Sequence, residues 1–301
     1  MRRWLEFVAA WLALKTLGIL PRPLARGVGA LLTRLAFFLR PPLRRAAVFN
    51  LRLAFPDFSD AERRRILRSL VRQVGWMAGE FAQFPRYTRA RIERIVVLDG
   101  FENFDAAQRL GKGVLFLTGH TSAWELAPFA QALYGYPLHF LVRPIDNARV
   151  DALVNRYRCL SGNTPIEKNK SARAMLQILR AGGTIGVLID QNTSPEEGVF
   201  VAFFGVPACT TSGLARIALR TEATVVPGFL FWDEHMRKYR LRFEPAIELQ
   251  RTGDEQRDIV ENTARFTRAV EDYIRRHPDQ WLWVHKRWRT RPPGEKPIYP
   301  F

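Results

Sequence analysis

Hydrophobic residues along this chain fall into short apolar runs that alternate with longer, helix-like segments. The runs predict strands near residues 94–98, 113–118, 137–143, 184–190, 223–233 and 238–249. The segments between them predict helices near residues 101–110, 122–134, 147–161, 171–181, 210–221 and 255–276. Strands that alternate with helices favour an α/β fold with a mostly parallel central sheet flanked by helices. The last two strands are expected to form an antiparallel hairpin.

The N-terminal residues are more apolar than the rest of the chain. A run from Trp4 to Leu20 is broken only by Glu6 and Lys15, and a second apolar stretch runs from Leu24 to Leu39. The first run is close to the shortest length that spans a bilayer, and the second is typical of an interfacial helix. No small-residue cleavage site of a signal peptide follows. We expect a membrane anchor here, with a buried pair of soluble helices as the alternative.

A basic helical region comes next. A helix is predicted over residues 44–55, and the capping box Ser59-Asp60-Ala61-Glu62 predicts a second helix through about residue 84. Arginines crowd the start of this second helix, at positions 63, 64, 65, 68 and 72. Beside an anchor they are expected to meet phosphate groups, although such a run is also typical of a solvated face. We therefore predict an anchor at residues 1–40 and one α/β domain at residues 41–301.

Charge and cysteine content restrict the class of protein. The 301 residues carry a formal charge of +17, which favours an anionic partner such as nucleic acid, anionic lipid, or an acidic protein or substrate. The two cysteines, Cys159 and Cys209, match neither a disulfide framework nor a zinc-binding pattern. Each is expected to be a small apolar filler, and no metal or other cofactor is predicted.

A histidine follows the second predicted strand in the segment Thr118-Gly119-His120, and Glu125 stands five residues later in the first turn of a predicted helix. Open α/β sheets bind ligands at the carboxyl ends of their strands. A histidine held by a carboxylate can take a proton from a hydroxyl and return it to a leaving group. His120 and Glu125 are therefore the predicted catalytic pair. Ser122 and Glu125 also fit a capping box, which could coexist with that role.

Two further predicted strands end in polar residues that should converge beside His120. Arg143 follows one strand, and its guanidinium suits the binding of a phosphate or an oxyanion. Asp190 follows the other strand; it could orient Arg143, bind a hydroxyl or stabilise a turn. A salt bridge between Arg143 and Asp190 is the structural alternative. His139, inside an apolar strand, is expected to be a core histidine.

Two later segments are rich in aromatic residues. Residues 201–208 are predicted to form an apolar loop that could line the path of an acyl chain or belong to the core. Residues 281–289 interleave aromatic rings with cations. Such interleaving is typical of a membrane interface or of stacking on nucleic-acid bases.

These motifs, in their order, resemble the late acyltransferases of lipid A biosynthesis (the lauroyl and myristoyl transferases) and the wider lysophospholipid acyltransferase family. The matching motifs are Asn50-Leu51-x-Leu53-Ala54-Phe55-Pro56, Thr118-Gly119-His120-x4-Glu125, Arg143-Pro144-x-x-Asn147, Asp190-Gln191, Phe203-Phe204-Gly205-x-Pro207-Ala208 and Pro278-x-Gln280-Trp281-Leu282-Trp283-x-His285-x-Arg287-Trp288. They cover nearly the whole chain. One stretch departs from the pattern: Thr121-Ser122-Ala123 stand where the lipid A enzymes usually have an aromatic residue, a small residue and Asn. Some relatives acylate glycolipids other than lipid A precursors, so this departure bears on the identity of the acceptor.

The resemblance implies an enzyme on the cytoplasmic face of a bacterial inner membrane. It would move a fatty acyl group from acyl carrier protein or coenzyme A to a hydroxyl of an anionic glycolipid. His120 would be the general base, and Glu125 would orient and charge it. Arg143 and Asp190 would shape the acceptor site, and the matched Asn147, Gln191 and Gly205 are predicted substrate-binding residues beside them. Such direct transfer needs neither a metal nor a nucleophilic Ser or Cys.

Other functions are compatible with parts of the sequence. The acceptor could be another lysophospholipid or glycolipid. A basic nucleic-acid-binding protein would explain the charge, but the apolar N-terminus and the lack of a recognisable nucleic-acid motif argue against it, so no nucleic-acid partner is predicted. A membrane scaffold without activity is a third possibility, against which the intact His120 and Glu125 count.

Overall fold

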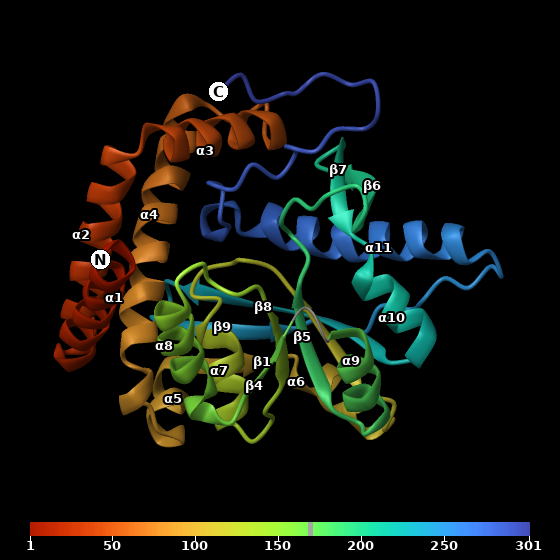
Figure 1. Cartoon of the computed structure of the whole chain (residues 1–301), viewed down its shortest axis with the longest axis horizontal. Coiled ribbons are helices and arrows are strands. Elements are labelled where there is room, and N and C mark those ends of the chain that lie inside the picture. The colour runs from red at the N-terminus through yellow and green to blue at the C-terminus, as the bar shows by residue number, and fades with distance from the viewer. Residues whose placement is uncertain (168–170) are drawn as a thin grey trace.

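A seven-stranded sheet lies at the centre of the computed structural model, which describes residues 1–167 and 171–301 (Figure 1). In spatial order the strands are β1 (Val96–Asp99), β9 (Lys238–Phe243), β8 (Thr224–Asp233), β2 (Val114–Thr118), β5 (Thr184–Leu188), β3 (His139–Val142) and β4 (Thr164–Glu167). The five strands from β8 to β4 run parallel to one another. Strand β9 is antiparallel to β8 and pairs in parallel with β1. The predicted sheet and its final hairpin are thus confirmed.

Helices cover both faces of the sheet, and strand β2 shows why. Val114 and Phe116 belong to one buried apolar cluster, while Leu115 and Leu117 belong to the other. Successive strand residues point to opposite faces, so a continuous apolar run requires cover on both sides. One cluster includes residues of α5 (Arg89–Ile95), α6 (Phe101–Arg109), α7 (Leu126–Leu133) and α8 (Ala148–Arg158); the other includes residues of α9 (Ser171–Arg180), α10 (Gly213–Thr221) and α11 (Glu255–Arg276).

Several boundaries differ from the predictions. Strand β4 was not predicted, the predicted strand at 238–249 ends at Phe243, and α7 begins four residues later than expected. Short 3₁₀ turns lie at Phe84–Arg86, Cys159–Ser161 and Pro278–Gln280.

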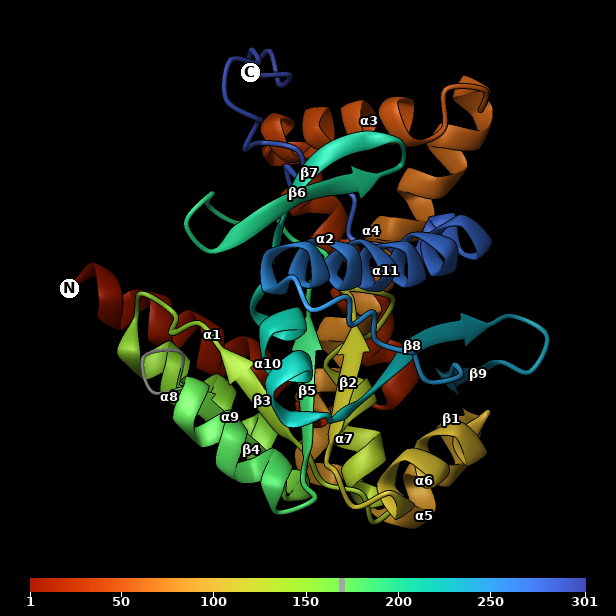
Figure 2. The same ribbon diagram turned by 90° about the vertical axis from the view of Figure 1, so that its right-hand side faces the viewer.

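The predicted apolar loop at 201–208 is instead most of a β-hairpin. Strands β6 (Gly198–Phe203) and β7 (Val206–Thr211) are antiparallel and lie on the far side of α11 from the sheet (Figures 1 and 2). Phe204 and Gly205 both have positive φ, at 52° and 74°, which matches the twist that two-residue hairpin turns require. A phenylalanine at the first turn position is unusual, and this hid the hairpin in the sequence.

Four helices form the N-terminal region: α1 (Arg2–Ile19), α2 (Arg22–Leu39), α3 (Pro41–Ala54) and α4 (Asp60–Ala82). They gather on one side of the molecule, and the predicted capping box at Ser59 and Glu62 is present (Figure 1). Among the described residues, no helix combines the length and the hydropathy that crossing a bilayer requires. Large apolar side chains nevertheless remain exposed on the first three helices. They are Trp4, Leu5, Trp11, Leu12, Ile19, Leu24, Val28, Leu31, Leu32, Leu35, Phe38, Leu39 and Leu43.

A buried ion pair ties α2 to α4. Glu80 is fully buried, and its carboxylate accepts a hydrogen bond from Arg22 at 3.0 Å and another from the Tyr87 hydroxyl. Arg26 is also buried, with its guanidinium 3.5 Å from the centre of the Trp76 ring and 4.3 Å from that of Trp232. Arg26 therefore faces the core, while Leu24 and Leu31 of the same helix stay exposed.

Gly75 allows α2 and α4 to cross at very short range. A Cβ atom at Gly75 would lie 2.3 Å from the Cα atom of Ala30, which is backbone and cannot rotate away. We expect Gly75→Ala to lower the free energy of unfolding by about 1–3 kcal/mol, because the helices must separate. Gly27→Ala is the matched control: a Cβ there meets nothing within 4 Å, and the change should stabilise the helix by roughly 0.5–1 kcal/mol. Urea unfolding of both variants measures the difference, and equal effects would contradict the close crossing.

Candidate active site

The loop after β2 brings His120 onto the carboxylate of Asp190, which follows β5. The His120 backbone N–H donates to Asp190 Oδ2 at 2.8 Å, and the ring Nδ1 lies 2.8 Å from Oδ1. An ionised carboxylate can only accept, so Nδ1 carries the proton and Nε2 keeps its lone pair. Gly119 makes this approach possible, since a Cβ there would lie 3.2 Å from the Asp190 carboxyl carbon.

Asp190 is almost fully buried and charged. Burial would raise its pKa, but the charge of His120, the hydrogen bonds from His120 and the indole N–H of Trp281 hold that pKa at about 2. The Trp281 Nε1 to Asp190 Oδ2 distance is 2.7 Å. The pKa of the His120 ring shifts the other way. Burial lowers this pKa, but the charge and hydrogen bond of Asp190 outweigh burial and raise it above 6.5. The pair can therefore hold a proton on His120 during a reaction.

Glu125 differs from its predicted position as the direct partner of His120. Its carboxylate receives two hydrogen bonds from Arg158 of α8, at 2.9 and 2.5 Å. Its negative charge still acts on His120 and raises the pKa of that ring. The capping box is not formed either, because Ser122 Oγ donates to Gln73 and α7 begins only at Leu126. The spacing His-x4-Glu thus corresponds to two neighbouring ion pairs, not to a single one.

The other predicted site residues divide into two groups. Gln191 lies with its amide nitrogen 3.2 Å from His120 Nε2, and Arg143 is exposed and lines the cavities described below. The alternative salt bridge between Arg143 and Asp190 is not formed, since the hydrogen bonds described for Asp190 come from His120 and Trp281.

Asn147 and Gly205, the other two predicted substrate-binding residues, lie away from His120. Asn147 is the N-cap of α8; its Oδ1 accepts from the Arg149 backbone N–H at 3.2 Å, and its Nδ2 donates to the Arg3 carbonyl at 2.6 Å. Gly205 occupies the turn of the β6–β7 hairpin, where its positive φ suits glycine. Neither residue lines the cavities beside His120.

Two cavities meet near His120. The inner cavity, of about 220 Å³, extends from His120 and Trp124 between the sheet and α7; its apolar lining includes Phe116, Phe129 and Leu138. The outer cavity, of about 670 Å³, is lined by polar residues such as Gln191, Thr193 and Arg216 and by apolar ones such as Met175 and Leu176. Arg143 borders both cavities. An apolar chain and a polar group could therefore meet next to the imidazole.

The C-terminal segment supports the loop that carries Asp190. This supporting role was not predicted from the sequence. The backbone N–H of Asn192 donates to His285 Nε2 at 2.9 Å, and its side-chain oxygen accepts from the Thr290 backbone N–H at 2.9 Å. Burial lowers the pKa of His285 to about 4, so this ring is a neutral acceptor. The Leu282 N–H donates to the His120 carbonyl at 3.1 Å. The family motif that contains His285 was the sequence signal that could have indicated this role.

The prediction that residues 281–289 meet a membrane or nucleic acid is wrong. Trp281, Trp283, Arg287 and Trp288 are each 1% exposed or less. Arg287 donates to the Cys209 carbonyl at 2.8 Å and lies 5.0 Å from the centre of the Phe203 ring. The aromatic residues pack in the core, and the cation is held by carbonyl and ring contacts.

The described residues contain no group of three or more His, Cys, Asp or Glu side chains arranged to hold a metal ion. Both cysteines are free; Cys209 is buried, as expected for an apolar filler, and Cys159 is partly exposed.

Comparison with known proteins finds relatives over nearly the whole chain. The sequence model of the family described as bacterial lipid A biosynthesis acyltransferase matches residues 1–290. The lipid A biosynthesis lauroyltransferase of Escherichia coli (strain K12) is 30% identical over 297 residues, which cover 97% of this chain and 92% of that protein. The palmitoleoyltransferase of the same organism is 28% identical over 300 residues, covering 98% and 94%. Its myristoyltransferase is 26% identical over 304 residues, covering 98% and 93%.

Proposed function

The chain belongs to the bacterial lipid A biosynthesis acyltransferases, and we propose that it moves a fatty acyl group from a thioester donor to a hydroxyl of a lipid A precursor, with His120 as general base. The donor is acyl carrier protein or coenzyme A. The observation that carries the proposal is the position of His120: a ring with an unprotonated Nε2, held by a buried carboxylate, at the mouth of a cavity lined largely by apolar side chains.

The proposed reaction is a single acyl transfer. His120 Nε2 takes the proton of the acceptor hydroxyl while the oxygen attacks the thioester carbonyl. The negative charge of Asp190 stabilises the imidazolium that forms. As the tetrahedral intermediate collapses, the C–S bond breaks and the imidazolium returns the proton to the leaving thiolate. Each proton and electron pair is thereby accounted for without a covalent enzyme intermediate.

Charged groups around the ring have separate proposed roles. Arg143, exposed where the two cavities meet, binds the oxyanion or a phosphate of the acceptor through its forked donors. The Glu125–Arg158 pair shapes the wall of the inner cavity and adds negative charge near His120. Gln191, whose amide touches His120 Nε2, must turn away or share that atom when the acceptor hydroxyl arrives.

The inner cavity is the proposed acyl site. Its lining by Phe116, Phe129 and Leu138 offers an apolar environment directly beside His120. In the outer cavity, Gln191, Thr193 and Arg216 offer the hydrogen bonds and positive charge that a sugar and its phosphate need.

The exposed apolar side chains of α1, α2 and α3 support a proposed position at the cytoplasmic face of the inner membrane. Contiguous exposed apolar surface is costly in water, and it suits helices that lie in the interface without crossing the bilayer. The excess positive charge of the chain would favour an anionic surface as well.

Mass spectrometry of cellular lipids tests the function. A strain that lacks the chain, complemented with wild type or with His120→Ala, is compared for lipid A species. We expect wild type to add the mass of one acyl group to a lipid A precursor, and His120→Ala to add none, because the hydroxyl keeps its proton. A mass gain on another lysophospholipid or glycolipid would show that this lipid, and not a lipid A precursor, is the acceptor. Equal lipid profiles in all strains would refute acyl transfer.

A further inference from the structure

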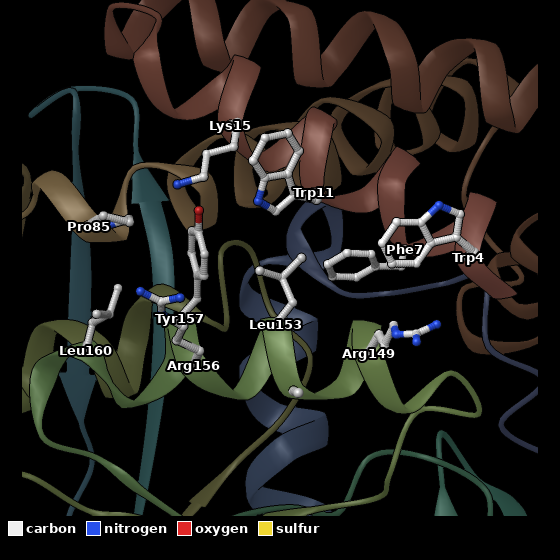
Figure 3. A pocket seen from close by; sticks show the side chains of 11 residues that line it. Trp4, Phe7, Trp11, Lys15, Pro85, Arg149, Leu153, Arg156, Tyr157 and Leu160 are labelled. Carbon is white, nitrogen blue, oxygen red and sulfur yellow. The ribbon is translucent and has the colours of Figure 1, made fainter.

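A groove between α1 and α8 lies outside the site described above. Its cavity is about 570 Å³. Phe7 and Trp11 project from α1 towards Leu153 and Tyr157 on α8, so apolar side chains face each other across the gap (Figure 3).

The groove is held open by contacts at both ends of α1. Near the start of the helix, Asn147 donates to the Arg3 carbonyl at 2.6 Å. Near its end, Gln83 donates to the carbonyls of Leu17 and Leu20, at 2.7 and 2.9 Å. Between these fixed ends the helices do not close on each other. An apolar gap of this size forfeits dispersion contacts along its whole lining, so an apolar occupant would be favoured.

Cations edge the groove and no acid lines it. Lys15 and Arg156 lie at the end near Tyr157, and Arg149 lies at the other end, 5.0 Å from the ring centre of Trp4 (Figure 3). None of the three cations forms an ion pair within the described part of the chain. An apolar slot with free positive charge at its rim has the chemistry of a site for an amphiphile with an anionic head.

We propose that this groove binds one anionic phospholipid of the surrounding bilayer. One acyl chain lies between the aromatic residues of α1 and the apolar face of α8, and the phosphate lies against Lys15 and Arg156. The exposed Leu5 and Leu12 on the same helix continue the apolar surface from the groove towards the membrane. The proposal rests on the proposed membrane contact of α1 to α3, and it does not depend on acyl transfer.

Native mass spectrometry of the full chain in detergent tests the site. The protein is titrated with phosphatidylglycerol and, separately, with phosphatidylcholine of the same acyl chains. We expect one phosphatidylglycerol to be retained in preference to phosphatidylcholine. Lys15→Gln combined with Arg156→Gln should weaken phosphatidylglycerol binding on the order of 30-fold at low salt and abolish the preference, because two cations near a phosphate are lost.

Two further variants make the test specific. Ala152 is exposed and lines the groove, so Ala152→Trp should fill it and reduce the binding of both lipids. Arg257→Gln combined with Arg268→Gln removes the same charge from exposed positions on α11 and should leave binding unchanged. Thermal unfolding checks that each variant is folded. If Ala152→Trp does not fold, the Lys15 and Arg156 variant and its charge control are sufficient to test the site.

Three outcomes would overturn the proposal. They are equal retention of the two phospholipids by wild type, unchanged binding in the Lys15 and Arg156 variant, and equal weakening in the α11 control. His120→Ala should keep the bound phosphatidylglycerol while losing acyl transfer, and vesicle flotation reports membrane contact separately. The failure of this site can therefore be distinguished from the failure of the proposed function.

Discussion

Replacing His120 with alanine should lower kcat/KM for acyl transfer by about 10²–10⁴-fold, the usual contribution of a positioned general base. Without the imidazole, the acceptor hydroxyl must lose its proton to water while it attacks the thioester. Removal of the ring also takes a partner from the buried Asp190 carboxylate, so we expect the free energy of unfolding to fall by about 1–3 kcal/mol as well. Release of free thiol from an acyl carrier protein thioester, with a purified acceptor, measures the rate.

His235→Ala is the matched control for this variant. His235 is an exposed histidine in the turn between β8 and β9, and it takes no part in the proposed reaction. Its variant should retain the wild-type rate. Turnover of His120→Ala within a few-fold of wild type would remove His120 from the reaction, provided thermal unfolding shows both variants folded.

Asp190→Asn should reduce kcat/KM by a comparable factor, about 10²–10⁴-fold, while keeping the shape of the side chain. Two effects add. The imidazolium loses the buried charge that stabilises it, and an amide can present N–H where the carboxylate could only accept, which favours the wrong tautomer of His120.

The pH dependence separates Asp190 from a merely structural residue. The base is active only when unprotonated, and Asp190 raises the pKa of His120 above 6.5. In wild type, kcat/KM should therefore rise with pH to a plateau, with a midpoint above 6.5. In Asp190→Asn the opposing effect of burial, which lowers the pKa, becomes dominant, so the midpoint should move to lower pH. An unchanged midpoint in the variant would contradict the assigned coupling, whatever the loss in rate.

Much of the fold could be predicted because it depends on local patterns. The apolar run of β2 needs cover on two faces, and the alternation of runs with helices sets a parallel sheet. The hairpin of β6 and β7 could not be predicted from its turn, because Phe204 adopts a conformation that favours glycine or asparagine. The burial of Arg26 could not be predicted, because it depends on Trp76 and Trp232, which are distant in sequence.

The site was predicted in part. Strand ends converge, so His120, Arg143 and Asp190 were expected in one crevice, and the structure brings all three to the carboxyl edge of the sheet. The sequence could not show which of the two nearby carboxylates, Asp190 or Glu125, binds His120, because their positions relative to the ring differ by only a few ångströms. The sequence spacing favoured Glu125. The His120 ring instead bonds to Asp190, because the two residues follow the paired strands β2 and β5. Arg158, on a helix that follows β3, takes Glu125 instead.

The geometry of the reactive ring also depends on a part of the chain that is made long after the ring itself. Trp281 and His285 fix the carboxylate loop, and they lie more than a hundred and fifty residues after His120 in the order of synthesis. A ribosome must therefore release the chain beyond His285 before the groups that transfer the proton can assemble. Activity in this enzyme thus reports completed folding, and a chain that stops short of this segment would have a histidine but no working base.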